Sequence, residues 1–193
     1  SRTAKDTIMR RIYDSDLLAR KKYKYSDLGY YLFMGLIEKV EGKTLDKLVQ
    51  ERLYGPIGAY TMTYKPTEKY DLKKIVPTEN DNTFRKQTLR GYVHDQGAAM
   101  IGGVAGHAGL FSSANDLAKM MQLYLDGGVY GGQVFFDSVT VSEFARCQYC
   151  DEDNRRGIGF DKPQLEGEGP TCGCVSPLSF GHTGFTGTIA WAD

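Results

Sequence analysis

The sequence has no excess of either charge, because 24 lysine and arginine residues are matched by 24 aspartate and glutamate residues. Balanced charge provides no field to hold a phosphate backbone, so we expect no nucleic-acid partner. Long apolar runs are also missing, and the longest, at residues 30–37, is too short to span a bilayer. Four cysteines in 193 residues are too few for a disulfide scaffold. The core must therefore come from the 41% of residues that are hydrophobic.

Apolar periodicity predicts a mainly helical first part. The strongest helix follows Ser26 and stops at Gly42, and its apolar stripe is expected to be substantially buried. Residues 59–96 lack a period and are interpreted as a long surface excursion with short strands, of the kind that forms lids or walls of sites. The further helices are expected over Thr3–Tyr13, from Thr44 to Gly55-Pro56, from Ser113, which would cap it, to Gly127-Gly128, and after Asp137.

The last part of the chain is β-rich. Three short strands are expected, at Gly157–Phe160, Ser179–His182 and Gly187–Trp191, and they would form one thin sheet. Helices followed by strands predict a mixed α+β fold.

The cysteines form two close pairs, Cys147-x-x-Cys150 and Cys172-x-Cys174. Four thiolates could hold a structural zinc ion, but the second pair has an unusually short spacing. Free thiols or a disulfide are the alternatives. None of these states implies catalysis.

Two sequence features near histidines have structural interpretations. The glycine-rich run at residues 102–109 lacks nucleotide-binding spacing, which favours close packing of its backbone beside a helix. Asp95 could orient the ring of the adjacent His94, although a structural histidine with satisfied hydrogen bonds is the commoner outcome.

Two other groups suggest chemistry. Tyr25-Ser26-Asp27 stands at the start of the strongest helix, where it could also serve merely as an aromatic staple. His182 lies in the stretch from Gly181 to Gly187, where one strand ends and another begins. Such a position can gather a ring, a hydroxyl and backbone N–H groups at a strand edge.

In this order, Tyr25-Ser26-Asp27, the Gly106–Ser113 run and Gly181-His182-Thr183-Gly184 resemble the serine β-lactamase and penicillin-binding-protein-like family, on the branch of class C enzymes and esterases. The resemblance extends from about Lys24 to Asp193. It is nearest to the β-lactamase-like domain fused to family-three glycoside hydrolases. It implies a partial β-lactamase/transpeptidase-like fold, with a helical region and the late strands of an antiparallel sheet.

The resemblance also implies roles. Tyr25 would be the catalytic tyrosine, a phenol that acts as a base only where neighbouring cations lower its pKa. His182 would be catalytic in the third motif, and the backbone N–H of Phe185 would be an oxyanion donor. Thr183, Gly184 and Asp27 would bind substrate.

Two of these residues depart from the usual pattern. His182 replaces a lysine, and this replacement weakens binding of a substrate carboxylate at neutral pH. Asp27 stands where asparagine is common, which exchanges an amide donor for an acceptor.

The family's Ser-x-x-Lys motif is absent from residues 1–193. We therefore interpret the chain as an incomplete β-lactamase-like domain, without the N-terminal nucleophile segment and the C-terminal strand and helix, and expect it to be inert alone. The intact domain would be a serine hydrolase acting on an ester, amide or cell-wall-derived peptide. The alternative is a non-catalytic penicillin-binding-like module that recognises ligands or has a structural role.

Other expectations concern partners and place. We expect no cofactor, no catalytic metal ion and no membrane span. The partners would be a small-molecule or peptide substrate, a glycoside hydrolase domain in the same parent chain, and further copies through an exposed sheet edge. The family resemblance favours the periplasm or cell envelope.

Overall fold

A computed structural model describes residues 3–18, 23–152, 154–166 and 169–193. The chain divides into two compact units. The first contains residues 1–56 and 60–112, and the second contains residues 57–59 and 113–193.

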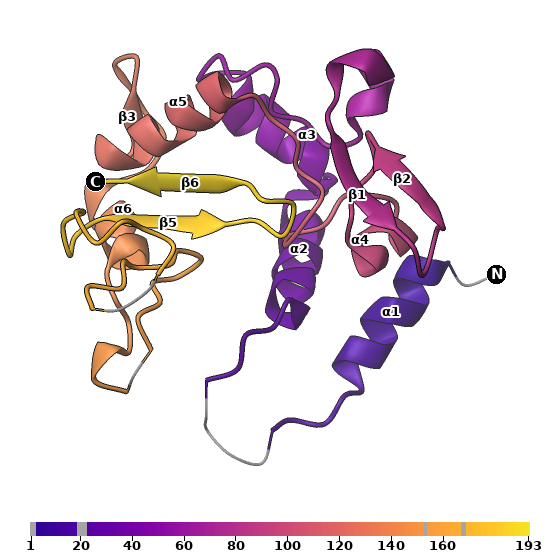
Figure 1. Ribbon diagram of the computed structural model, residues 1–193, viewed down its shortest axis with the longest axis horizontal. Helices are drawn as coiled ribbons and strands as arrows, with labels where there is room; N and C mark the ends of the chain where they lie inside the picture. The colour runs from indigo at the N-terminus through magenta and orange to yellow at the C-terminus, as the bar shows by residue number, and fades with distance from the viewer. Residues whose placement is uncertain (1–2, 19–22, 153, 167–168) are drawn as a thin grey trace. The chain divides into compact units, whose positions relative to one another are not determined.

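The first unit opens with the expected helices (Figure 1). Thr3 caps the first of them with its side chain, and Gly42 ends the second in the left-handed conformation that glycine adopts at low cost. The predicted helix after Thr44 changes from α-helical to π-helical turns part-way. The elements are α1 (Ala4–Tyr13), α2 (Leu28–Glu41), α3 (Leu45–Val49) and η1 (Gln50–Tyr54).

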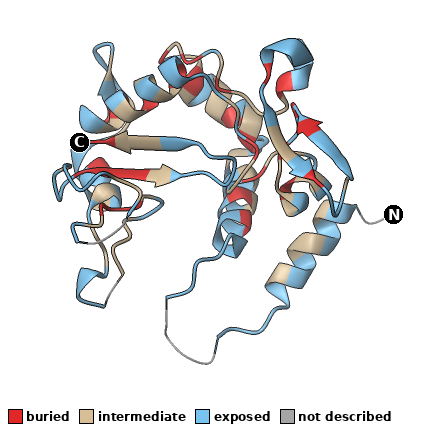
Figure 2. Cartoon of the chain, in the orientation of Figure 1, coloured by how far each residue is buried: buried red, intermediate tan, exposed pale blue. Residues whose placement is uncertain are grey.

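The prediction that α2 is substantially buried is wrong. Its buried residues are Tyr31 and Met34, and most of the helix is intermediate or exposed in Figure 2. Apolar residues occur on several sides of α2, whereas Met34 packs into a small core with Leu45, Val93, Ala98 and Ala105. The exposed side chains include Phe33, Leu36 and Val40.

The excursion at residues 59–96 contains the expected short strands. Strands β1 (Pro77–Asp81) and β2 (Gln87–Arg90) pair antiparallel. The buried Asp81 side chain holds the turn between them by accepting hydrogen bonds from the backbone of Thr83, Phe84 and Arg85. Two short 3-10 helices precede the hairpin, η2 (Pro66–Glu68) and η3 (Leu72–Lys74).

The glycine-rich run packs closely against α2, as predicted. A Cβ atom on Gly106 would lie 2.5 Å from the carbonyl oxygen of Tyr30, so only glycine allows this approach. Directly before the run lies a short helix that we did not predict, α4 (Gln96–Met100), capped by the Asp95 side chain. Ala98 and Ala105 bring both segments into the core.

The second unit is built around α5 (Ala114–Leu125), whose predicted cap is confirmed because Ser113 accepts from the backbone N–H of Asp116. A small hairpin that we missed follows, and a Gly131-Gly132 turn with positive φ at both residues joins its strands. Its strands are β3 (Val129–Tyr130) and β4 (Gln133–Val134), and the later helices are α6 (Ser138–Ala145) and η4 (Cys150–Glu152).

The late sheet has two strands instead of the expected three. Strands β5 (Phe180–Thr183) and β6 (Ile189–Ala192) pair antiparallel. The segment 157–160 is not a strand, because the backbone of Gly157 bonds to Phe160 and that of Ile158 bonds to Phe144. Only Asp161, just beyond it, forms a bridge to Gly181.

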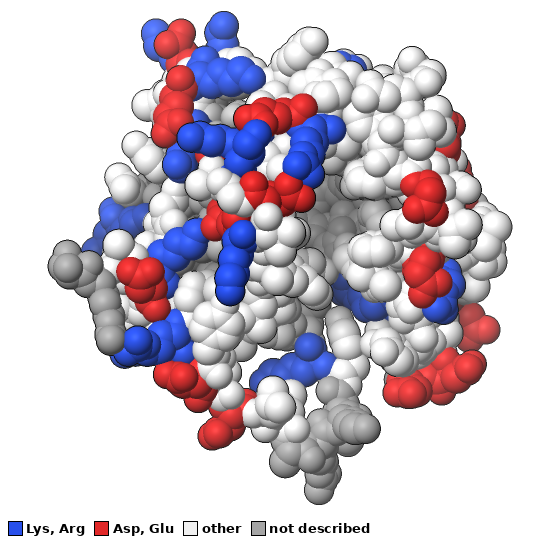
Figure 3. All heavy atoms as spheres, turned by 180° about the vertical axis from the view of Figure 1, so that it is seen from behind, with Lys and Arg blue, Asp and Glu red and all other residues white. Residues whose placement is uncertain are grey.

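Among the described residues, no helix is both long enough and apolar enough to traverse a bilayer. Lysine and arginine groups lie next to aspartate and glutamate groups on the face shown in Figure 3. This surface agrees with the balanced composition.

Candidate functional site

The Tyr25-Ser26-Asp27 group lies at the N-terminus of α2. The backbone carbonyl of Asp27 accepts hydrogen bonds from the N–H groups of Tyr30 and Tyr31, so it begins the helix. The Ser26 hydroxyl accepts from the N–H of Leu28. Tyr25 is 61% exposed, and Asp27 is also exposed.

An Asp–His pair lies beside this helix start. His107 Nε2 is 3.0 Å from Asp95 Oδ1, and because a carboxylate only accepts, the ring nitrogen donates. The His107 hydrogen bond is the main cause that lowers the pKa of Asp95, and the Ala98 N–H contributes. Asp95 is therefore hydrogen-bonded to the ring of His107 in the glycine-rich run, whereas the sequence suggested that it could orient the adjacent His94.

Tyr31 links this pair to α2. Its ring packs on that of His107 with centroids 4.4 Å apart. Burial raises the pKa of Tyr31 to about 12, with further contributions from the charges of Asp95 and Asp27. A Cβ atom on Gly97 would lie 2.1 Å from the Tyr31 hydroxyl oxygen, so the phenol fits closely against α4.

Asp27, Asp95 and His107 are also the described residues that could hold a metal ion, since their potential ligand atoms lie within 4.8 Å of one another. Bound metal would compete with the His107 contact and with the N–H of Ala98, both of which reach the same Asp95 oxygen. We therefore interpret the cluster as a hydrogen-bonded pair next to an exposed carboxylate.

The third predicted motif lies at the end of β5. Gly184 begins a tight turn in which its N–H donates to the carbonyl of Thr188 over 2.7 Å. A Cβ atom on Gly184 would lie 2.2 Å from the Thr188 hydroxyl oxygen, so a larger residue here would require the Thr188 side chain to move. Thr183 and Phe185 are exposed on this hairpin.

His182 has a hydrogen-bond partner on each ring nitrogen. Its Nδ1 lies 2.6 Å from the carbonyl oxygen of Thr183, and its Nε2 lies 2.7 Å from Nη1 of Arg156. The Arg156 contact comes from a loop 26 residues earlier and was not predicted.

Asp161 supports this arrangement from beside the strand. Its backbone bridges to Gly181, directly before His182, and its buried carboxylate binds Arg155 and lies 3.5 Å from Nε of Arg156. One residue therefore contacts both the first half of β5 and the arginine beside the histidine.

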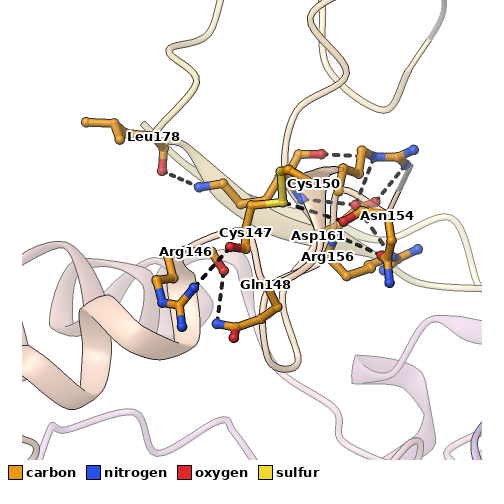
Figure 4. The surroundings of a disulfide bond; sticks show 10 residues. Arg146, Cys147, Gln148, Cys150, Asn154, Arg156, Asp161 and Leu178 are labelled. Carbon is orange, nitrogen blue, oxygen red and sulfur yellow. Dashed lines mark hydrogen bonds and ion pairs between the residues drawn. A yellow bond between two sulfur atoms is a disulfide. The ribbon is translucent and has the colours of Figure 1, made fainter. Parts of the chain in front are cut away.

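The cysteines lie near the same loop. Cys147 and Cys150 form a disulfide, shown in Figure 4, whereas Cys172 and Cys174 are free and exposed. Because the first pair is bridged, the four cysteines cannot supply four thiolates to a zinc ion. The first pair is a disulfide and the second pair is two free thiols. The bridged turn contacts the arginine loop, because Gln148 N–H donates to the carbonyl of Arg156.

The predicted residues therefore fall into two groups. Tyr25 and Asp27 belong to the first unit, whereas His182, Thr183, Gly184 and Phe185 belong to the second. Their convergence on one cleft stays a prediction, as does the oxyanion role of the Phe185 N–H.

Sequence reasoning missed the supporting residues of both groups. The His107–Asp95 contact and the Arg156–His182 contact join residues that no local spacing connects. The first unit also has a cavity of about 550 Å³ whose lining includes Lys65, Arg85 and Tyr92 but neither Tyr25 nor Asp27.

Comparison with known proteins decides the family. The family described as Beta-lactamase matches residues 2–193. The chain belongs to the Beta-lactamase family. This is a family of serine hydrolases, and the mixed helix and sheet architecture is that of its fold.

Two relatives, from Escherichia coli (strain K12) and Salmonella gallinarum, each bear the name "Putative D-alanyl-D-alanine carboxypeptidase". They are 39% and 38% identical to this chain and match 89% and 90% of it. The chain spans only 42% and 43% of their lengths.

A solved structure extends the fold comparison. A penicillin-binding protein homologue from Caulobacter crescentus superimposes with a TM-score of 0.57 at 21% identity, covering 91% of this chain and 50% of its own. This similarity supports the assignment of a partial β-lactamase/penicillin-binding-protein-like fold.

Proposed function

We propose that this chain is part of a serine hydrolase domain that cleaves, through an acyl-enzyme, a cell-wall-derived peptide ending in a free carboxylate. The observation that carries the proposal is the presence of Tyr25 and His182-Thr183-Gly184 in a chain 38–39% identical to relatives named as carboxypeptidases. The exposed Tyr25 would take part in proton transfer, and the β5 end would bind the substrate.

We also propose that the 193-residue chain alone is inert. The acylated serine of the family lies in Ser-x-x-Lys, which this sequence does not contain. Losing the nucleophile removes the covalent route, and losing its backbone donor weakens the oxyanion site by ~3 kcal/mol. The second candidate is a non-catalytic ligand-binding module.

The first step of the test is to read the parent sequence before Ser1, where we expect a Ser-x-x-Lys motif. The full-length protein is then treated with a fluorescent penicillin and with a fluorophosphonate. Labelling that disappears in the Ser→Ala variant and falls strongly in Tyr25→Phe supports the hydrolase. Absence of labelling across the pH range supports the binding module, and the 193-residue chain serves as the unlabelled control.

The proposed place of action is the periplasm or cell envelope. A disulfide between Cys147 and Cys150 fits an oxidising compartment, and the carboxypeptidase names of the relatives agree with it. The resemblance further predicts a glycoside hydrolase domain in the parent chain. Fractionation of cells that express the full-length protein tests the location, and the parent sequence tests the fusion.

A further inference from the structure

The two hydrogen-bond partners of His182 differ in whether they can donate or accept. A backbone carbonyl can only accept, so Nδ1, 2.6 Å from the Thr183 oxygen, must carry the proton. An arginine guanidinium can only donate, so Nε2, 2.7 Å from Arg156 Nη1, must accept. A ring that donates from one nitrogen and accepts at the other is the neutral imidazole.

Arg156 is itself held in place. Its side chain is 25% exposed, and its Nε faces the carboxylate of Asp161, whose side chain is only 6% exposed. Its backbone is fixed at both polar groups, because its N–H donates to Asn154 Oδ1 and its carbonyl accepts from Gln148. The guanidinium beside His182 is therefore part of an ordered network.

We propose that Arg156 is the positioning residue of the His182-Thr183-Gly184 motif, holding His182 as the neutral Nδ1–H tautomer and supplying the fixed positive charge that the imidazole lacks. A guanidinium stays charged throughout the physiological pH range. The charge beside Thr183 thus comes from a residue outside the motif. Its use toward a substrate carboxylate rests on the proposed function, whereas the tautomer does not.

The tautomer is tested by 15N NMR of the full-length protein labelled at histidine. The His182 ring signals are assigned by their loss in His182→Gln. At neutral pH we expect Nδ1 to carry the proton and Nε2 to show the shift of an unprotonated nitrogen. A predominant Nε2–H tautomer or a doubly protonated ring would overturn the proposal.

Variants separate Arg156 from the rest of the network. Arg156→Met removes the N–H donors and should release His182 from the Nδ1–H form, whereas Arg156→Lys should largely retain it. Arg155→Met is the matched control, because Arg155 also binds Asp161 but comes from the neighbouring position. Release of the tautomer in Arg155→Met to the same extent would contradict a specific role for Arg156.

The charge is tested by acylation kinetics on two acyl donors, one with a carboxylate and one without. Loss of the tautomer should slow both reactions, so the charge is read from the difference between them. Arg156→Met should lower kcat/KM for the penicillin roughly 10- to 100-fold more than for an uncharged ester, the extra loss being that typical of a charged hydrogen bond. An equal loss on both donors would overturn the charge role. If the wild-type protein acylates with neither, the proposed function fails, and the NMR experiment still decides the tautomer.

Discussion

Asp95 and His107, twelve residues apart in the chain, are joined by a 3.0 Å hydrogen bond that ties the cap of α4 to the glycine-rich run. The His107 ring packs at a tilt against Tyr31, one turn inside α2, and its side chain is only 4% exposed. The start of the helix that carries Asp27 is thus supported by a polar pair whose imidazole is buried and whose carboxylate is partly exposed.

Removing His107 should destabilise the first unit. We expect His107→Ala to cost about 2 kcal/mol, because a buried hydrogen bond to a carboxylate is lost. Since folding lowers the pKa of Asp95, this stabilisation is present above the ordinary aspartate range and is lost as pH falls through the lowered pKa. Urea unfolding at neutral and acidic pH measures both effects. A double-mutant cycle with Asp95→Asn that shows no coupling would refute the pair.

Acid sensitivity should also depend on Asp81. Hydrogen bonds from the Arg85 side chain and from the Phe84 backbone lower its pKa, so its contribution is present above the ordinary aspartate pKa and disappears at lower pH. We expect Asp81→Asn to reduce the melting temperature at neutral pH and to flatten its decline in acid. Asp71→Asn, at an exposed cap without a side-chain hydrogen bond, is the control. Identical acid profiles for wild type and Asp81→Asn would contradict the stabilising role of the Asp81 carboxylate.

Tyr31 and Tyr25 should differ in their effects on chemistry. A pKa of about 12 keeps the Tyr31 phenol protonated near neutral pH, which makes it unsuitable as a base. We expect Tyr31→Phe to change penicillin labelling of the full-length protein only a few-fold, whereas Tyr25→Phe should lower it strongly. The reverse order would assign the base to Tyr31.

The exposed face of α2 should promote self-association of the 193-residue chain. Phe33 and Val40 are 59% and 73% exposed, and burial of such apolar side chains favours contact between copies. Sedimentation velocity should show a mass that rises with concentration, and Phe33→Asp with Val40→Asp should reduce it. Lys39→Asp on the same helix is the control. An association unchanged by the double substitution would point instead to the edge of the β5–β6 sheet.

Local sequence signals predicted the local structure well. The cap at Ser113 and the stop at Gly42 depend on neighbouring residues, so the start of α5 and the end of α2 could be derived. The β3–β4 hairpin was also within reach, because Gly131-Gly132 between short apolar pairs is a turn signal.

Features set by distant contacts could not be derived. Residues 157–160 have a strand-like composition, but the backbone there bonds to Phe144 and closes on itself. The partner of His182 is equally hidden, since Arg155 and Arg156 look alike in the sequence and only the fold brings one to the imidazole. For the candidate site, the motif residues were visible in the sequence and their supports were not.

The Cys147–Cys150 bridge closes a very small ring, so in the chain-entropy description it should contribute only about 2 kcal/mol, less than a bridge across a long loop. Its influence is therefore local, acting through Gln148 and Asn154 on the loop that carries Arg156. A purification buffer that contains dithiothreitol would accordingly leave a well-folded preparation with an altered β5 terminus. Handling conditions, and not only mutations, would then decide whether two laboratories measure the same state of the protein.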